Sequence, residues 1–175
     1  SVRLDKKKCK ACTSCLKRCP TEAIRVRGGR AHIINELCID CGECIRVCEN
    51  HAKYALTDPL SSIKRFRYKI ALPAPSLYGQ FKQLASPSQV LEGLLKIGFD
   101  DVFEVAEGAD IVTRAIRERM RTIERDKYPV ISSACPAIVR LIRVRFPELI
   151  PHIVNVRQPM EVAAMVAKRE FCKRN

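Results

Sequence analysis

Tryptophan is absent from this sequence of 175 residues, and only 6% of the residues are aromatic. The apolar runs are short and interrupted by charge, so none approaches the roughly 18 apolar residues that a membrane helix needs. The first residues also lack the pattern of a signal peptide. We therefore expect a soluble, cytoplasmic protein with no membrane span.

Acidic residues are outnumbered, because 32 Lys and Arg stand against 19 Asp and Glu and give a net charge of +13. Such a surface can attract nucleic acid, anionic lipid or an acidic redox protein, and net charge alone does not choose among them. The few aromatics and the lack of a nucleic-acid-binding signature argue against nucleic acid. An acidic ferredoxin or flavodoxin is the docking partner that we expect.

Cysteine is concentrated at one end of the chain, where eight of the ten lie within the first 48 residues. They form two runs with the same C-x2-C-x2-C-x3-C spacing, and the second run follows the first by 29 residues. The members of the two runs are Cys9, Cys12, Cys15 and Cys19, and then Cys38, Cys41, Cys44 and Cys48.

The spacing within each run suits a [4Fe–4S] cubane. Two-residue gaps let three thiolates wrap around one compact inorganic core, but the fourth cysteine lies too far along to close the same cluster. In two-cluster ferredoxins that fourth cysteine ligates the other cluster. The ligand sets that we predict are therefore Cys9, Cys12, Cys15 and Cys48 for one cluster, and Cys38, Cys41, Cys44 and Cys19 for the other.

Zinc and disulfides are the alternatives for so many cysteines. Structural zinc takes paired C-x2-C arms with four ligands per ion, so the third cysteine of each run would be surplus. Disulfide frameworks suit secreted chains, and nothing indicates secretion. Two iron–sulfur clusters are thus the favoured cofactors. Since residues 1–58 contain too little apolar sequence for an ordinary core, we expect this part to be largely unfolded without them.

The segment between the two runs has the pattern of a β-hairpin, with alternating residues 23–27 and 30–34 around Gly28-Gly29. Together with the runs, it resembles bacterial two-cluster ferredoxins over residues 3–58. One departure is Glu49 after Cys48, where Cys19 is followed by Pro20. A carboxylate there favours the oxidised, less negative cluster, so we expect the two potentials to differ.

Helical and strand patterns alternate from residue 68 on. Strand patterns cover 69–73, 101–106 and 129–133, and helical patterns cover 86–98, about 108–125 and the residues after Cys135-Pro136. Strands separated by helices imply a parallel sheet. We therefore predict an α+β two-cluster domain over 1–58, a linker over 59–67 and part of an α/β lobe over 68–175.

Cys135 follows the third predicted strand, at the edge where parallel sheets place their ligands. Pro136 suits the first helical position, so Cys135 falls at the helix N-cap, where free N–H groups stabilise a thiolate. Considered alone, this residue is either a metal ligand or nucleophile, or a small buried side chain. Cys172 lies in a basic run and is interpreted as a surface thiol.

The run 130–137, continued by 145–149 and 158–160, resembles the first conserved segment of the [FeFe]-hydrogenase catalytic domain, and residues 72–76 and 98–102 are similar to the start of that domain. The resemblance implies that Cys135 ligates the cubane of the H-cluster in a longer parent chain. It also places Ala134 where the family has a proton-relaying cysteine. The two further cysteine motifs of the family, Pro-Cys-x-x-Lys and Cys-x-x-Gly-Cys, do not occur in the sequence.

Alanine cannot transfer a proton, and this departure resembles the sensory branch of the family, in which slow turnover reports on hydrogen or redox state. We therefore expect an electron-transfer module that carries electrons through two clusters toward a hydrogenase-type site. The alternative is a redox- or hydrogen-sensing regulatory module with little or no turnover. Because the chain begins with Ser1 rather than Met and stops just after a helical, charged stretch, we also expect a parent protein that contributes the rest of the hydrogenase or a signalling domain. A processed natural chain is the alternative.

Overall fold

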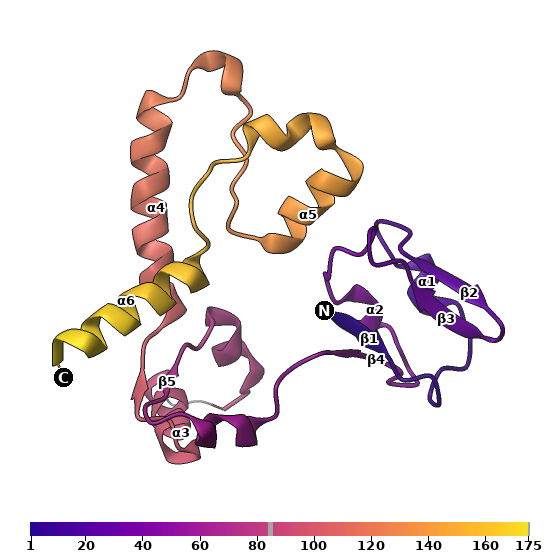
Figure 1. Cartoon of the computed structure of the whole chain (residues 1–175), viewed down its shortest axis with the longest axis horizontal. Helices are drawn as coiled ribbons and strands as arrows, with labels where there is room; N and C mark the ends of the chain where they lie inside the picture. Colours follow the sequence, from indigo (N-terminus) through magenta and orange to yellow (C-terminus); the bar gives the residue numbers. More distant parts are fainter. Residues whose placement is uncertain (84–85, 175) are drawn as a thin grey trace. The chain divides into compact units, whose positions relative to one another are not determined.

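A computed structural model describes residues 1–83 and 86–174, which divide into two compact units (Figure 1). Unit 1 consists of Ser1–Asp58 and Cys135–Ile153, and unit 2 consists of Pro59–Ala134 and Val154–Asn175. Within the described ranges, no helix is long and apolar enough to cross a membrane.

Unit 1 contains two antiparallel strand pairs. Strand β1 (Val2–Leu4) pairs with β4 (Lys53–Ala55), and β2 (Ile24–Arg27) pairs with β3 (Arg30–Ile33). The second pair is the predicted hairpin, which is confirmed. Its turn residues Gly28 and Gly29 have φ angles of 54° and 69°, as a tight two-residue hairpin turn requires.

The 29-residue repeat of the cysteine runs is also a repeat of the backbone. Helix α1 (Ser14–Lys17) corresponds to α2 (Glu43–Arg46), and each begins after a left-handed residue, Thr13 at φ 63° and Gly42 at φ 79°. Left-handed angles recur at two more equivalent pairs, Ala11 with Asp40 and Glu22 with His51. Since non-glycine residues seldom adopt such angles, the two halves share one uncommon loop geometry.

Helix α5 (Pro136–Arg145) and the short 3-10 helix η4 (Pro147–His152) complete unit 1. Arg140 forms an ion pair with Asp40, and Arg145 Nη2 lies 3.2 Å from Glu22 Oε1. A segment far along the sequence is therefore tied to both halves of the repeat. Ile142, which is 4% exposed, provides its most buried apolar side chain.

Among its described residues, unit 2 contains one two-stranded parallel pair and three longer helices. Strand β5 (Ile70–Ala71) pairs in parallel with β6 (Asp101–Val102), so the parallel pairing predicted for these two segments is confirmed. The helices are α3 (Ser88–Ile97), α4 (Val105–Thr122) and α6 (Pro159–Arg174), and the 3-10 helices are η1 (Leu60–Arg65), η2 (Pro75–Gln80) and η3 (Arg125–Lys127).

Three strand predictions need correction. The strand expected over 69–73 covers only Ile70–Ala71. The strand expected over 101–106 ends at Val102, because α4 already begins at Val105. The strand expected over 129–133 is wrong, since only Ile131 makes a bridge, with its carbonyl accepting the Val154 N–H at 2.8 Å. Ser133 bonds the carbonyl of Val156 at 2.7 Å, and such side-chain bonds compete with a regular strand ladder. The helix predicted over 86–98 is confirmed as α3, which ends at left-handed Gly98.

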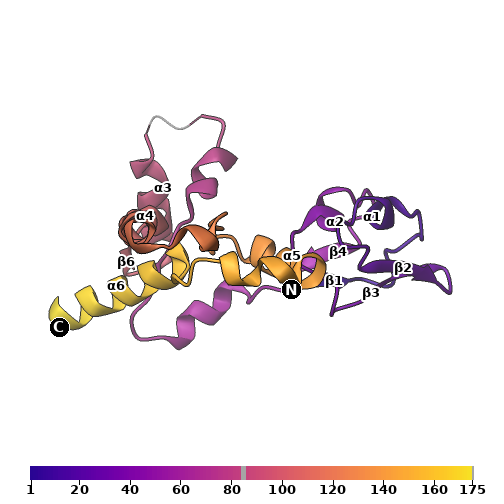
Figure 2. The ribbon, with the colours of Figure 1, turned by 90° about the horizontal axis from the view of Figure 1, so that it is seen from above.

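Helices α4 and α6 are in close contact. Figure 1 shows the first turns of α6 against the first turns of α4, and Figure 2 shows the same contact with α4 seen end-on. A Cβ atom on Gly108 would lie 2.4 Å from the Pro159 carbonyl oxygen and 2.9 Å from the Ala163 backbone nitrogen. Ala163 is fully buried at 0% exposure. The missing side chain of Gly108 thus sets the distance between the two backbones.

We predict that Gly108→Ala destabilises unit 2, although alanine is the better helix former by about 1 kcal/mol. The reason is that the contacting atoms are backbone and cannot move without separating the helices. Gly93→Ala in α3 is the matched control, because its added Cβ meets nothing within 4 Å and should stabilise by about 0.5–1 kcal/mol. Thermal unfolding measures both, and a Gly108→Ala protein as stable as Gly93→Ala would contradict the proposed close packing.

Candidate iron–sulfur sites

Two cavities in unit 1 are each lined by four cysteines, three from one run and the fourth from the other. Site 1 is defined by Cys9, Cys12, Cys15 and Cys48, and site 2 by Cys19, Cys38, Cys41 and Cys44. The space between the atoms, partly open to solvent, is about 360 Å³ in site 1 and about 350 Å³ in site 2. The structure therefore brings together the same sets of four that the sequence predicts.

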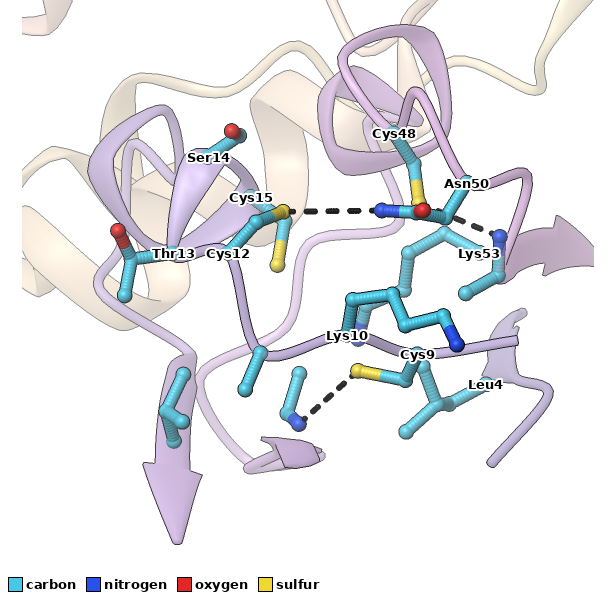
Figure 3. Close-up of a pocket in the computed structure, with 14 residues that line it drawn as sticks. Leu4, Cys9, Lys10, Cys12, Thr13, Ser14, Cys15, Cys48, Asn50 and Lys53 are labelled. Atoms are coloured by element: carbon cyan, nitrogen blue, oxygen red, sulfur yellow. Dashed lines mark hydrogen bonds between the residues drawn. The ribbon is translucent and has the colours of Figure 1, made fainter. Parts of the chain in front are cut away.

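Backbone N–H groups point at several of these sulfurs. The Ala52 N–H donates to Cys48 Sγ at 3.2 Å, and the equivalent Ala23 N–H donates to Cys19 Sγ at 3.2 Å. In site 1 the Ala31 N–H also donates to Cys9 Sγ at 3.4 Å (Figure 3). Such donors stabilise a thiolate over a thiol and are among the groups that set the potential of an iron–sulfur cluster.

Burial opposes the ionisation of Cys15, Cys38 and Cys44, which we call the inner cysteines. It raises the pKa of the Cys15 and Cys38 thiols, and it raises the pKa of Cys44 to about 11. The hydrogen bond from Ala31 lowers the pKa of Cys9. Without iron, the inner cysteines are therefore neutral thiols at neutral pH, and metal binding must displace their protons.

The donor set fits iron–sulfur clusters. Each cavity offers four thiols around a central space together with N–H groups directed at sulfur, which is the environment that a cubane needs. Over the described parts of the chain, no group of three or more His, Cys, Asp or Glu side chains is close enough to hold a single metal ion.

The charged side chains around the two sites differ. Site 2 is lined by Asp40 and Glu43. Burial opposes the ionisation of Asp40, but the Val2 N–H at 2.9 Å and the Arg140 guanidinium outweigh it and lower the pKa of this carboxyl. A hydrogen bond from Arg46 likewise lowers the pKa of Glu43. Both residues are thus carboxylates at neutral pH.

Site 1 is lined instead by Lys10 and Lys53, and Lys53 is only 3% exposed. Sequence reasoning missed Lys53 and considered only the exposed Glu49. The sequence repeat could have revealed Lys53. This residue is 29 positions after Ile24, so one half of the repeat has a cation where the other half has an apolar residue.

Cys135 is exposed and is the N-cap of α5, with Pro136 at the first turn, so the predicted position at a helix start is confirmed. The predicted position at the edge of a parallel sheet is wrong, because residues 129–133 form no strand. Ala134 is exposed as well, and the adjacent Ser132 hydroxyl accepts the Ala134 N–H at 3.3 Å. Cys135 is a free thiol and belongs to no described group of three or more metal-binding side chains. Cys172 is exposed on α6.

An open cleft lies beside Cys48, between α1 and α2. Its lining includes Lys17, Arg18 and Arg46, with Glu49 as the acidic member. All four of these side chains are exposed. Site 1 thus reaches a basic surface through one of its own cysteines.

Comparison with known proteins agrees with this geometry. Residues 67–175 match the family model described as "Iron only hydrogenase large subunit, C-terminal domain", and residues 1–49 match a "4Fe-4S dicluster domain". The periplasmic [Fe] hydrogenase large subunit of Nitratidesulfovibrio vulgaris is 28% identical over an alignment of 185 positions, which covers 95% of this chain and 44% of that protein.

Two more relatives are named hydrogenases. Iron hydrogenase 1 of Clostridium pasteurianum is 24% identical over 60% of this chain and 20% of its own length. The NADP-reducing hydrogenase subunit HndD of Solidesulfovibrio fructosivorans is 21% identical over 98% of this chain and 35% of its own length. The chain therefore spans less than half the length of each of these curated relatives. The family model covers more than half of this chain, which belongs to the iron-only hydrogenase large-subunit family.

Proposed function

We propose that this chain is an electron-transfer module that binds one [4Fe–4S] cluster in site 1 and one in site 2. The observation that carries the proposal is the pair of four-cysteine cavities, related by the 29-residue repeat and each closed by a cysteine from the other half. Each cubane, when bound, takes up and releases a single electron. The hydrogenase family supports a redox role at low potential.

The residues of the chain hold and shield the two sites. The small apolar cluster of Cys15, Ile24 and Ala31 is buried, and it limits the access of water to the sulfurs beside it. The N–H groups of Ala23 and Ala52 fix the orientation of the two exchanged cysteines, Cys19 and Cys48. Fixed donors and a rigid shell keep the structural change on electron transfer small.

Iron analysis of paired cysteine variants tests both the number of clusters and the exchange of ligands. We expect about eight irons per reconstituted wild-type chain. Cys9→Ala combined with Cys48→Ala removes two ligands of site 1 only, so about four irons should remain. Cys9→Ala combined with Cys19→Ala removes one ligand from each site and should leave few or none.

If the variant with Cys9→Ala and Cys19→Ala retained more iron than the variant with Cys9→Ala and Cys48→Ala, each cysteine run would hold its own cluster. About four irons in the wild-type protein, or none, would contradict the two-cluster assignment. Electron paramagnetic resonance of the reduced samples reports in parallel whether the remaining iron is in a [4Fe–4S] cluster.

We also propose that an acidic redox protein docks at the cleft lined by Lys17, Arg18 and Arg46. The cleft is basic and Cys48 is among its lining residues, so a partner bound there would approach site 1. Charge complementarity of this kind raises the rate of association more than the final affinity.

Charge reversal in the cleft tests the docking proposal. We expect Arg18→Glu to lower the second-order rate of reduction by an acidic ferredoxin several-fold at low ionic strength, and the difference to vanish at high salt. Arg27→Glu is the matched control, because this exposed arginine belongs to the hairpin and does not line the cleft. Stopped-flow absorbance measures the rates, and equal effects of both variants would reject this surface.

A second candidate is a sensory role in a longer parent protein, and Ala134 at the proton-relay position favours it. Cys135 would supply one ligand of an H-cluster there, with the others outside the present sequence. In the matured parent we expect infrared bands of CO and cyanide together with slow hydrogen turnover, which Ala134→Cys should accelerate. A parent without these bands would have no H-cluster, and fast turnover with Ala134 in place would contradict the sensory role.

A further inference from the structure

Lys53, the first residue of β4, is a buried cation without a described partner. Its side chain lines site 1, and the residue is 3% exposed (Figure 3). The Nζ atom is fully enclosed and has no hydrogen-bond partner among the residues that the structure describes. An isolated buried ammonium is strongly unfavourable unless a negative charge lies nearby. An anion bound in site 1 would therefore stabilise the buried ammonium of Lys53.

The internal repeat provides a built-in comparison. The residue equivalent to Lys53 is Ile24, which lines site 2 and is 2% exposed. Lys10 of site 1 likewise corresponds to the apolar Ile39 of site 2, whereas Ala11 of site 1 corresponds to Asp40. The two sites thus share their cysteines and backbone but not their charge.

The charge of Lys53 reaches cysteines of both sites. Burial is the largest influence on the pKa of Cys15 and Cys44 and raises both, and the Lys53 charge is the next largest and lowers both. For Cys9, the hydrogen bond from Ala31 is the largest cause of the lowered pKa, and Lys53 adds to it. Two of these three cysteines belong to site 1 and one to site 2.

We propose that the buried ammonium of Lys53 makes the two clusters unequal, holding the reduction potential of the site 1 cluster above that of the site 2 cluster. The inference rests on the proposed two-cluster function. A cubane with four thiolate ligands is an anion and gains a further negative charge on one-electron reduction, so a buried cation beside it stabilises the reduced form. Asp40 and Glu43 act in the opposite direction at site 2, where their ion pairs with Arg140 and Arg46 offset part of that effect.

Lys53 and Glu49 have opposite effects on the reduction potential of a cluster in site 1, and their solvent exposure determines which effect is larger. Glu49 is exposed, so water and salt screen its carboxylate. Lys53 is buried at 3% exposure and is screened much less. The first electron taken up from a reductant such as dithionite therefore resides mainly at site 1.

The test replaces Lys53 by the residue that the repeat has at the equivalent position. In Lys53→Ile we expect both midpoint potentials to become more negative, with the larger shift at site 1. That shift should correspond to at least a tenfold loss in the one-electron equilibrium constant, which is about 59 mV. Lys53→Arg, which keeps the charge, should stay close to wild type.

Lys10→Met is the matched control, because it removes the same charge from the same cavity at an exposed position. Its shift should be smaller than that of Lys53→Ile and should disappear at high ionic strength, whereas the Lys53→Ile shift should persist. Redox titration followed by electron paramagnetic resonance measures the potentials. The Cys9→Ala and Cys48→Ala double variant retains site 2 alone and assigns the two values.

Equal shifts for Lys53→Ile and Lys10→Met, or a higher potential at site 2 than at site 1, would overturn the inference. If Lys53→Ile does not assemble, Lys53→Met keeps the length of the side chain without the charge and decides the same question. Iron analysis of the wild-type protein distinguishes failure of the Lys53 inference from failure of the proposed two-cluster function. About eight irons with unchanged potentials would reject the role of Lys53 alone, whereas no cluster at all would reject the proposed function.

Discussion

Each four-cysteine cavity of unit 1 takes three sulfurs from one half of the repeat and one from the other, and this exchange ties the two halves together. The geometry is set by short loops with left-handed residues at equivalent positions, such as Thr13 and Gly42. Neither half has a core of its own, since the buried cluster of Cys15, Ile24 and Ala31 is small. Filling either site would therefore stabilise both halves at once, which makes the expected clusters structural as well as redox-active.

The parts of the chain that were predictable from sequence are those governed by local rules. The hairpin followed from Gly28-Gly29 between alternating residues, and the end of α3 followed from Gly98, whose φ is 115°. The grouping of the cysteines followed from their spacing. The strand over 129–133 was wrong because Ser133 bonds the Val156 carbonyl across 23 positions of sequence, a contact that no local pattern encodes.

The features that were missed depend on tertiary contacts. Lys53 looks like an ordinary surface lysine until the fold encloses it beside Cys9 and Cys15, and only a comparison with Ile24 could have revealed it. The contacts of Arg140 and Arg145 with residues of the cysteine repeat join segments about one hundred residues apart. The cytoplasmic location stays a prediction, and one relative of this chain is named a periplasmic enzyme.

The contacts of α5 depend on side chains that a different two-cluster domain need not carry. The helix that begins at Cys135 places its arginines on Asp40 and Glu22, one carboxylate from each half of the repeat. A two-cluster domain acquired from another protein would lack those carboxylates unless its own loops carried them at the same positions. The two cysteine runs and the segment after Cys135 are thus linked by side-chain contacts, although almost ninety residues separate them along the chain.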